Sequence, residues 1–186
     1  MGIFGAQWGT VVMNGPTDDP VECGILRPVE NMLLTGSYRR NLDDKLRLAI
    51  PKQLRDALGF PEITSLFIAP GTDRALVIYT AEVLEQIGNT LGKLSPAAKE
   101  TRAFSRLFYA QAQPADVDRQ GRLRVPPDLA KLAGLTEGAE DSEVVVLGVR
   151  DRIELWQATA WDAFLEQTQP SYDDLAEAVF RNATAE

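Results

Sequence analysis

Apolar and polar positions alternate in two short segments, "RLAIP" from Arg47 and "GRLRVP" from Gly121. In each segment two apolar side chains would face inwards and arginine outwards, which is the period of a half-buried strand. A proline ends each strand, because proline removes a backbone donor and disfavours helical conformation in the preceding residue. Proline is welcome at the start of a helix, so "PKQLRDALG" and "PPDLAKLAG" are predicted to be short helices closed by Gly59 and Gly134.

A β-hairpin and then a longer helix are predicted after each short helix. "SLFIAP" and "ALVIY" flank the turn "GTDR", and "SEVVVLGV" and "RIELW" flank the turn "RD". Thr80 and Thr159 are expected to cap the helices after the two hairpins, the second with Asp162 as a capping box. A linking helix between the halves and a terminal amphipathic helix from Ser171 complete the pattern. The apolar stripes expected to be buried are Leu54 and Leu58; Leu129 and Leu132; Leu84, Ile87 and Leu91; Phe104, Leu107 and Phe108; Trp161, Phe164 and Leu165.

The chain contains an internal repeat, which should decide its architecture. The segments "LDDKLRLAIPKQLRDALGF" and "VDRQGRLRVPPDLAKLAGL" begin 75 residues apart, at Leu42 and Val117, and six of their nineteen positions are identical without a gap. The identical pairs are Asp43/Asp118, Arg47/Arg122, Leu48/Leu123, Pro51/Pro126, Leu54/Leu129 and Gly59/Gly134. Half of the chain alone would bury little surface. We therefore expect an α+β fold in which two halves pack about a pseudo-twofold axis and share one core.

The domain organisation follows from this repeat. The turn-rich start containing "NGPTDDP" has no period, so 1–31 is expected to be an irregular arm, or to lie upstream of a natural start at Met32. The remaining predicted parts are a first unit at 36–84, linking helices at 85–112, a second unit at 113–159, and C-terminal helices with a tail at 160–186.

The amino-acid composition excludes several kinds of catalytic and metal-binding site. The 186 residues include no histidine and a single cysteine, Cys23, so an internal disulfide, a Cys–His or Ser–His catalytic pair and the usual zinc sites are excluded within one chain. No nucleophile–base motif is present either, so neither an enzyme nor a bound cofactor or metal is expected. The longest apolar runs, such as "VVVL", are too short to cross a bilayer, and the start lacks the basic region of a signal peptide. A cytoplasmic protein is the simplest expectation.

Charge is unevenly distributed along the chain. The formal net charge is −8, yet residues 39–55 hold six basic residues against two acidic ones, a local +4 on the first repeat. Residues 165–186 hold five acids and one base, so the tail is acidic. A basic patch is most simply a solvated face, and the alternative is a nucleic-acid surface.

Three segments carry a resemblance to a known family. "GSYRRNLDDKLRLAIPKQLR" from Gly36, "AFSRLFYAQAQPADVDRQGRLRVPPDL" from Ala103 and "GVRDRIELW" from Gly148 resemble the bacterial MraZ family of transcriptional regulators, which carry two SpoVT-AbrB-type units per chain. The similarity runs from about Met32 to Gln167. It implies two tandem swapped-hairpin β-barrel halves flanked by helices. It also implies a ring-shaped homo-oligomer that binds repeated promoter sites on double-stranded DNA in the nucleoid and represses the division and cell-wall gene cluster.

By the same resemblance, Arg47 and Lys45 are the expected DNA contacts, although Arg47 could instead brace its turn. Lys45, Arg39, Arg40 and Lys52 are assigned to phosphates, which position a protein without specifying sequence. The residues assigned to bracing the turns are Asp43, Asp118, Gly121 and Arg122.

One position departs from the family pattern, because Leu46 stands where the family usually has glycine, as Gly121 does in the second unit. A left-handed backbone there would cost roughly 1–2 kcal/mol. Together with the excess of acid, this supports an alternative function, whereas the six basic residues in 39–55 support DNA binding. That alternative is a non-catalytic interaction scaffold of the same fold, with lapsed DNA binding, which holds another protein through its acidic tail.

Overall fold

The structure is a computed structural model that describes residues 33–63, 65–135 and 143–183. The irregular arm predicted for 1–31 lies outside these residues. The strands are β1 (Ser37–Asn41), β2 (Arg47–Ala49), β3 (Ser65–Pro70), β4 (Leu76–Tyr79), β5 (Gln113–Asp116), β6 (Arg122–Arg124), β7 (Glu143–Val149) and β8 (Arg152–Gln157). The helices are α1 (Lys52–Leu58), α2 (Ala81–Gly92), α3 (Lys99–Gln111), α4 (Pro127–Leu132), α5 (Ala158–Thr168), the 3-10 turn η2 (Gln169–Ser171) and α6 (Tyr172–Ala183). None of the described helices is long and apolar enough to cross a membrane.

The two halves are interleaved in one antiparallel sheet of order β1-β7-β8-β4-β3-β5. Strand β1 of the first half pairs with β7 of the second, β5 of the second pairs with β3 of the first, and β4 pairs with β8. By the repeat, β1 corresponds to β5, β3 to β7 and β4 to β8. Exchanging each strand for its counterpart gives the same sheet order, read from the opposite edge. This is the α+β architecture with a shared core that the repeat predicts.

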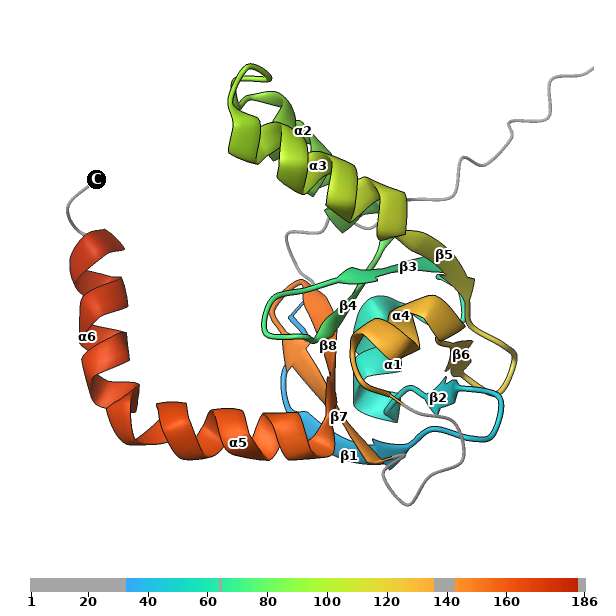
Figure 1. The fold of residues 1–186 in the computed structure, drawn as a ribbon. Helices are drawn as coiled ribbons and strands as arrows, with labels where there is room; N and C mark the ends of the chain where they lie inside the picture. Colours follow the sequence, from blue (N-terminus) through green and yellow to red (C-terminus); the bar gives the residue numbers. More distant parts are fainter. Residues whose placement is uncertain (1–32, 64, 136–142, 184–186) are drawn as a thin grey trace, which may run out of the picture.

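The closed barrel implied by the family resemblance is not what the described residues form. Strands β1 and β5 are the opposite edges of an open sheet, and β2 and β6 pair separately as a two-stranded ribbon. In Figure 1 the sheet curves around α1, α4 and the ribbon. The sheet stays open because β1 and β5 each pair with a single strand of the large sheet.

The main core lies between the sheet, the ribbon and the short helices. Leu48 and Leu123 face each other across the ribbon and are fully buried, together with Leu54 of α1 and Leu129 of α4. Leu132 is 45% exposed, contrary to the predicted stripe. It is the last residue of a six-residue helix, and the chain beyond it places Ala133 and Leu135 in the core instead.

The helix caps follow local sequence only in part. Thr80 caps α2, because its hydroxyl oxygen accepts a hydrogen bond from the backbone N–H of Val83 at 3.4 Å. The capping box expected at Thr159 is wrong. Helix α5 begins at Ala158 after Gln157, without a side-chain cap, and the carboxylate of Asp162 pairs with Arg39.

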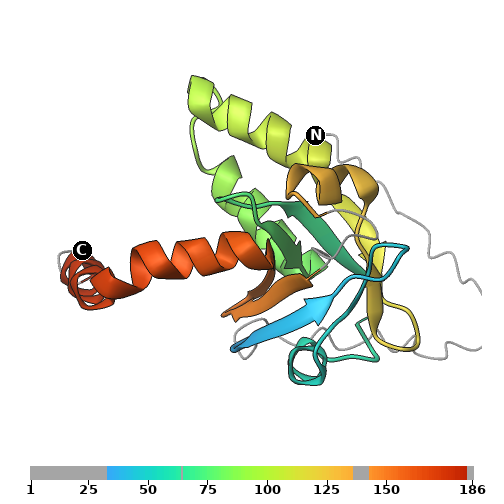
Figure 2. The same ribbon diagram turned by 60° about the horizontal axis from the view of Figure 1, so that its bottom comes forward.

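The α2–α3 hairpin and the α5–α6 arm project from the sheet in different directions (Figures 1 and 2). Phe108 of α3 is buried as predicted, whereas Phe104 and Leu107 are 52% and 63% exposed. The chain therefore buries only part of the apolar face of α3.

Candidate nucleic-acid interface

The ribbon of β2 and β6 has one apolar and one cationic face. Its antiparallel register places Arg47 opposite Arg124, Leu48 opposite Leu123, and Ala49 opposite Arg122. Because successive side chains point to opposite faces of a strand, the leucines enter the core and the three arginines share the outer face. The side chains of Arg47 and Arg122 are each 31% exposed, and Arg124 is exposed.

The turn that leads into β2 is organised by Asp43. One carboxylate oxygen of Asp43 accepts the backbone N–H groups of Lys45 and Arg47, both at 2.9 Å. The other carboxylate oxygen accepts the Nε–H of Arg47 at 2.6 Å. A short acidic side chain that satisfies the backbone of its own turn fixes that turn locally, so the direction of Arg47 is set by Asp43.

The turn that leads into β6 repeats this arrangement. Asp118 accepts the N–H groups of Gln120 at 2.9 Å and Arg122 at 3.0 Å with one oxygen, and the Nε–H of Arg122 at 2.8 Å with the other. The two Asp-x-x-x-Arg turns therefore have the same set of hydrogen bonds. The distinction drawn from the local charge, with Arg47 on DNA and Arg122 as a brace, has no counterpart in these contacts.

Both aspartates ionise more readily than an ordinary aspartic acid. Partial burial would raise the pKa of Asp43, but the N–H groups of Arg47 and Lys45 and the guanidinium of Arg47 together lower it. For Asp118 the N–H of Arg122 is the largest cause of a lowered pKa, and it outweighs the effect of burial. Hydrogen bonds to the charged form favour ionisation, so both turns are held by carboxylates near neutral pH.

The residue before the arginine in each turn has a left-handed backbone. The φ angle is 55° at Leu46 and 75° at Gly121. Leu46 therefore carries the conformational penalty of roughly 1–2 kcal/mol that a non-glycine residue meets there. Its side chain is only 3% exposed, and burial of a leucine contributes about 1.5–3 kcal/mol. Burial thus offsets the penalty.

The other expected DNA contacts are distributed over two places. Lys45 and Lys52 are exposed beside the ribbon, in the turn before β2 and at the start of α1. Arg39 and Arg40 lie on β1 in the large sheet instead. Arg39 pairs with Glu143 at 3.0 Å and with Asp162, and Arg40 donates to the backbone carbonyl oxygen of Arg39 at 2.7 Å.

Two further basic residues lie on the outer face of the ribbon or in its turns. Arg124 faces Arg47 across the ribbon, and Arg119 is exposed in the turn before β6. The alternation in "GRLRVP" already places Arg124 outwards, but nothing in the local sequence shows that β6 pairs with β2. The described residues contain no group of acidic or cysteine side chains that could hold a metal ion.

We call the outer face of the ribbon and its two turns the ribbon surface: Lys45, Arg47, Arg119, Arg122 and Arg124. Comparisons with known proteins match this chain over the whole region that contains the ribbon surface. The model of a family described as "MraZ protein, putative antitoxin-like" matches twice, over residues 33–107 and 108–182.

Proteins named "Transcriptional regulator MraZ" are similar over most of the chain. The protein from Lactobacillus helveticus (strain DPC 4571) is 37% identical over 145 residues, which cover 78% of this chain and 95% of the relative. The one from Ligilactobacillus salivarius (strain UCC118) is 35% identical over 145 residues, with the same coverage. The one from Finegoldia magna is 32% identical over 147 residues, 79% of this chain and 96% of the relative. With two tandem matches and relatives at this identity over nearly their full length, the chain belongs to the MraZ family.

Proposed function

We propose that this protein is a DNA-binding transcriptional regulator whose β2–β6 ribbon enters the major groove. The observation that carries the proposal is the register of the ribbon, which gathers Arg47, Arg122 and Arg124 on one outward face. The major groove of B-DNA admits a two-stranded β-ribbon. The planar fork of arginine can grip guanine or a phosphate through two hydrogen bonds. The names of the relatives, which describe transcriptional regulators, support the same function.

Local charge makes this possible in an acidic protein. The segments 43–49 and 118–124 together contain five bases and three acids, so their formal charge is +2 (5 − 3), against −8 for the whole chain. Two of the three acids, Asp43 and Asp118, direct their carboxylates to their own turns rather than outwards. Counterion release depends on the number of phosphates neutralised at the contact, and the ribbon surface supplies those contacts.

The finer part of the proposal is that the protein acts as a ring-shaped homo-oligomer. It would bind repeated sites upstream of the division and cell-wall gene cluster, in the nucleoid, and repress that cluster. Large apolar side chains are exposed on both projecting parts of the chain, and these are Leu94, Phe104, Leu107, Tyr172, Leu175 and Val179. Exposed apolar groups of this extent are typical of protein interfaces.

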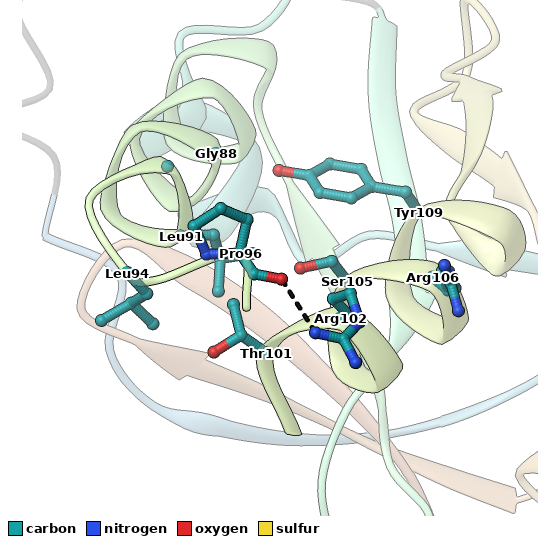
Figure 3. Close-up of a pocket in the computed structure, with 10 residues that line it drawn as sticks. Gly88, Leu91, Leu94, Pro96, Thr101, Arg102, Ser105, Arg106 and Tyr109 are labelled. Atoms are coloured by element: carbon teal, nitrogen blue, oxygen red, sulfur yellow. Dashed lines mark hydrogen bonds between the residues drawn. The ribbon is translucent and has the colours of Figure 1, made fainter. Parts of the chain in front are cut away.

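Charge supports contact between the two projecting parts of neighbouring copies. A cavity of about 400 Å³ lies between α2 and α3, lined by Leu91, Leu94 and Tyr109 beside Arg102 and Arg106 (Figure 3). Helix α6 presents three acids and one base in 172–183, so an acidic, partly apolar helix would meet a partly apolar cavity that is lined by two arginines. Several ribbon surfaces in one assembly would bind several sites through effective concentration.

Binding measurements with matched variants test the proposal. Gel shifts with the DNA upstream of the chain's own gene, carrying one, two or three repeats, should show affinity that rises with repeat number and falls steeply with salt. Arg47→Ala and Arg124→Ala should each weaken binding about tenfold or more, the loss expected for a base or phosphate contact. Arg74→Ala, in the exposed turn between β3 and β4 and outside both the ribbon surface and the proposed contact between copies, should bind like the parent protein.

Two results would contradict the proposal. Equal affinity for one and three repeats would exclude the multivalent mechanism, and unchanged binding by both ribbon variants would exclude the ribbon as the interface. Failure of the parent protein to bind any DNA would favour the interaction scaffold, whose partner would then be sought on the acidic helix α6.

A further inference from the structure

The two Asp-x-x-x-Arg turns contact the opposite half of the molecule through equivalent backbone hydrogen bonds. The carbonyl oxygen of Leu46 accepts from the N–H of Val125 at 2.8 Å, and that of Gly121 accepts from the N–H of Ile50 at 3.1 Å. Each turn therefore lies against the start of the short helix of the other half. Turn 43–47 meets the approach to α4, and turn 118–122 meets the approach to α1.

The side chains at these two junctions differ. A β-carbon added to Gly121 would lie 2.7 Å from both Cδ and Cζ of Arg55 and would collide with its Nη1. Arg55, from α1, thus occupies the space over the backbone of turn 118–122. Two features favour glycine at residue 121, because its φ of 75° is left-handed and Arg55 occupies the space where a side chain would begin.

The other junction has the opposite distribution of sizes. By the 75-residue relation between the halves, Arg55 corresponds to Ala130 of α4, and Gly121 corresponds to Leu46. Ala130 and Leu46 are both buried in the main core. One junction therefore combines a long helix side chain with glycine in the turn, and the other a small helix side chain with leucine in the turn. Exchanges that conserve total volume are the ones that cores tolerate best.

The guanidinium of Arg55 is held at a physical cost. Its Cζ lies 5.5 Å from the centroid of the Phe60 ring, and its Nη1 donates a long hydrogen bond of 3.5 Å to the backbone carbonyl oxygen of Gln120. Its Nε is buried and has no hydrogen-bond partner among the described residues. A buried unsatisfied donor is unfavourable, so an apolar side chain of similar length would fill this space at least as stably. What the guanidinium adds is its contact with the backbone of the turn.

We propose that Arg55 is a positioning residue, a cationic clamp from the first half on turn 118–122 of the second half. By holding the carbonyl oxygen of Gln120 it fixes the turn that presents Arg119 and Arg122 on the ribbon surface. Each turn is braced by its own aspartate, and turn 43–47 is held against the other half by the burial of Leu46 instead of a clamp. The contacts of the two turns with the opposite half thus differ, and only the second depends on a charge from the other half.

Backbone amide exchange in the full chain tests the clamp directly, with the other turn as an internal control. Arg55→Met keeps an unbranched apolar side chain and removes the guanidinium. The amides of Gln120, Gly121 and Arg122 should then exchange about fivefold faster, as expected for the loss of one hydrogen bond. Those of residues 45–47 should stay within about twofold of the parent protein. Equal acceleration at both turns, or none at turn 118–122, would overturn the proposal. Arg55→Leu, which also lacks the guanidinium, would decide it by the same comparison if Arg55→Met did not fold.

The consequence for DNA binding rests on the proposed function. Arg55→Met should weaken binding about tenfold while the slope of log Kd against log salt concentration stays that of the parent, because no phosphate contact is lost. Arg124→Met, in contrast, should reduce that slope by about one. A reduced slope for Arg55→Met would make Arg55 a phosphate contact and overturn its positioning role. If the parent protein bound no DNA, the proposed function would fail, and amide exchange would still decide the clamp.

Discussion

Leu46 offers a test of how burial and backbone strain are balanced in the first turn. Its φ of 55° is left-handed and its side chain is 3% exposed in the main core. Replacing it by glycine removes both the strain, roughly 1–2 kcal/mol, and the apolar contacts. Truncation of a buried leucine costs about 2–5 kcal/mol. The second term is larger, so we expect Leu46→Gly to be less stable than the parent protein.

A comparison with alanine separates the effect of backbone strain from the effect of lost burial. Leu46→Ala loses most of the burial and keeps the strain, whereas Leu46→Gly loses slightly more burial and relieves the strain. Glycine should therefore cost no more than alanine at this position. Leu48 is an equally buried leucine in a strand, with no left-handed backbone. There glycine should cost about 1 kcal/mol more than alanine, because it loses a buried methyl group and more conformational entropy.

Urea unfolding of the five proteins at one fixed concentration gives these free energies. A Leu46→Gly protein as stable as the parent would mean that strain outweighs burial. An equal gap between glycine and alanine at positions 46 and 48 would mean that the left-handed backbone contributes nothing. Either result would refute the balance of burial against backbone strain at Leu46.

Three further expectations concern the turns, a helix cap and the exposed helix face. Because the pKa values of Asp43 and Asp118 are lowered on folding, their stabilising effect is complete above the unfolded pKa of about 4 and is lost as pH falls through the folded pKa values. The difference in unfolding free energy between the parent and a double Asp→Asn variant should therefore shrink from pH 7 to pH 3. A difference that stays constant with pH would contradict this. Thr80→Ala should lower the free energy of unfolding by about 1 kcal/mol through loss of the α2 cap, and an unchanged midpoint in urea would show that the long 3.4 Å bond contributes nothing. If the proposed homo-oligomer forms, substituting Phe104 and Leu107 by serine should reduce its size in sedimentation while the unfolding temperature changes little, because both side chains are exposed in the single chain. An unchanged sedimentation coefficient would exclude this face as the contact between copies.

The elements of the fold were accessible from the sequence because their causes are local. Pro51 and Pro126 precede the two short helices, and Gly59 and Gly134 follow them with left-handed backbones, as the sequence predicts. The cap at Thr80 was found in the same way. The cap expected at Thr159 failed because a tertiary contact competes for it, since the carboxylate of its partner Asp162 pairs with Arg39 of β1.

Only part of the candidate site could be predicted from the sequence. The sequence places arginine on the outer side of each strand, but the charge count around each repeat separated Arg47 from Arg122. The ribbon joins them, with Arg124 and Arg119 beside them, because β2 and β6 pair across 75 residues. The stripe on α3 shows the same limit. Its period marks an apolar face, whereas the exposure of Phe104 and Leu107 depends on where the hairpin lies relative to the sheet.

By itself the sequence determined that two similar units exist, which short segments are strands and helices, and that Asp43 and Asp118 each stand four residues before an arginine. These features depend on forces within a few residues, namely side-chain period, proline and glycine geometry, and turn hydrogen bonds. Only the tertiary structure decided that the halves exchange strands in an open sheet, that the arginines share one face, and that Arg55 covers Gly121. Those outcomes depend on contacts between residues distant in the chain, which are selected by packing of the whole core rather than by any one segment.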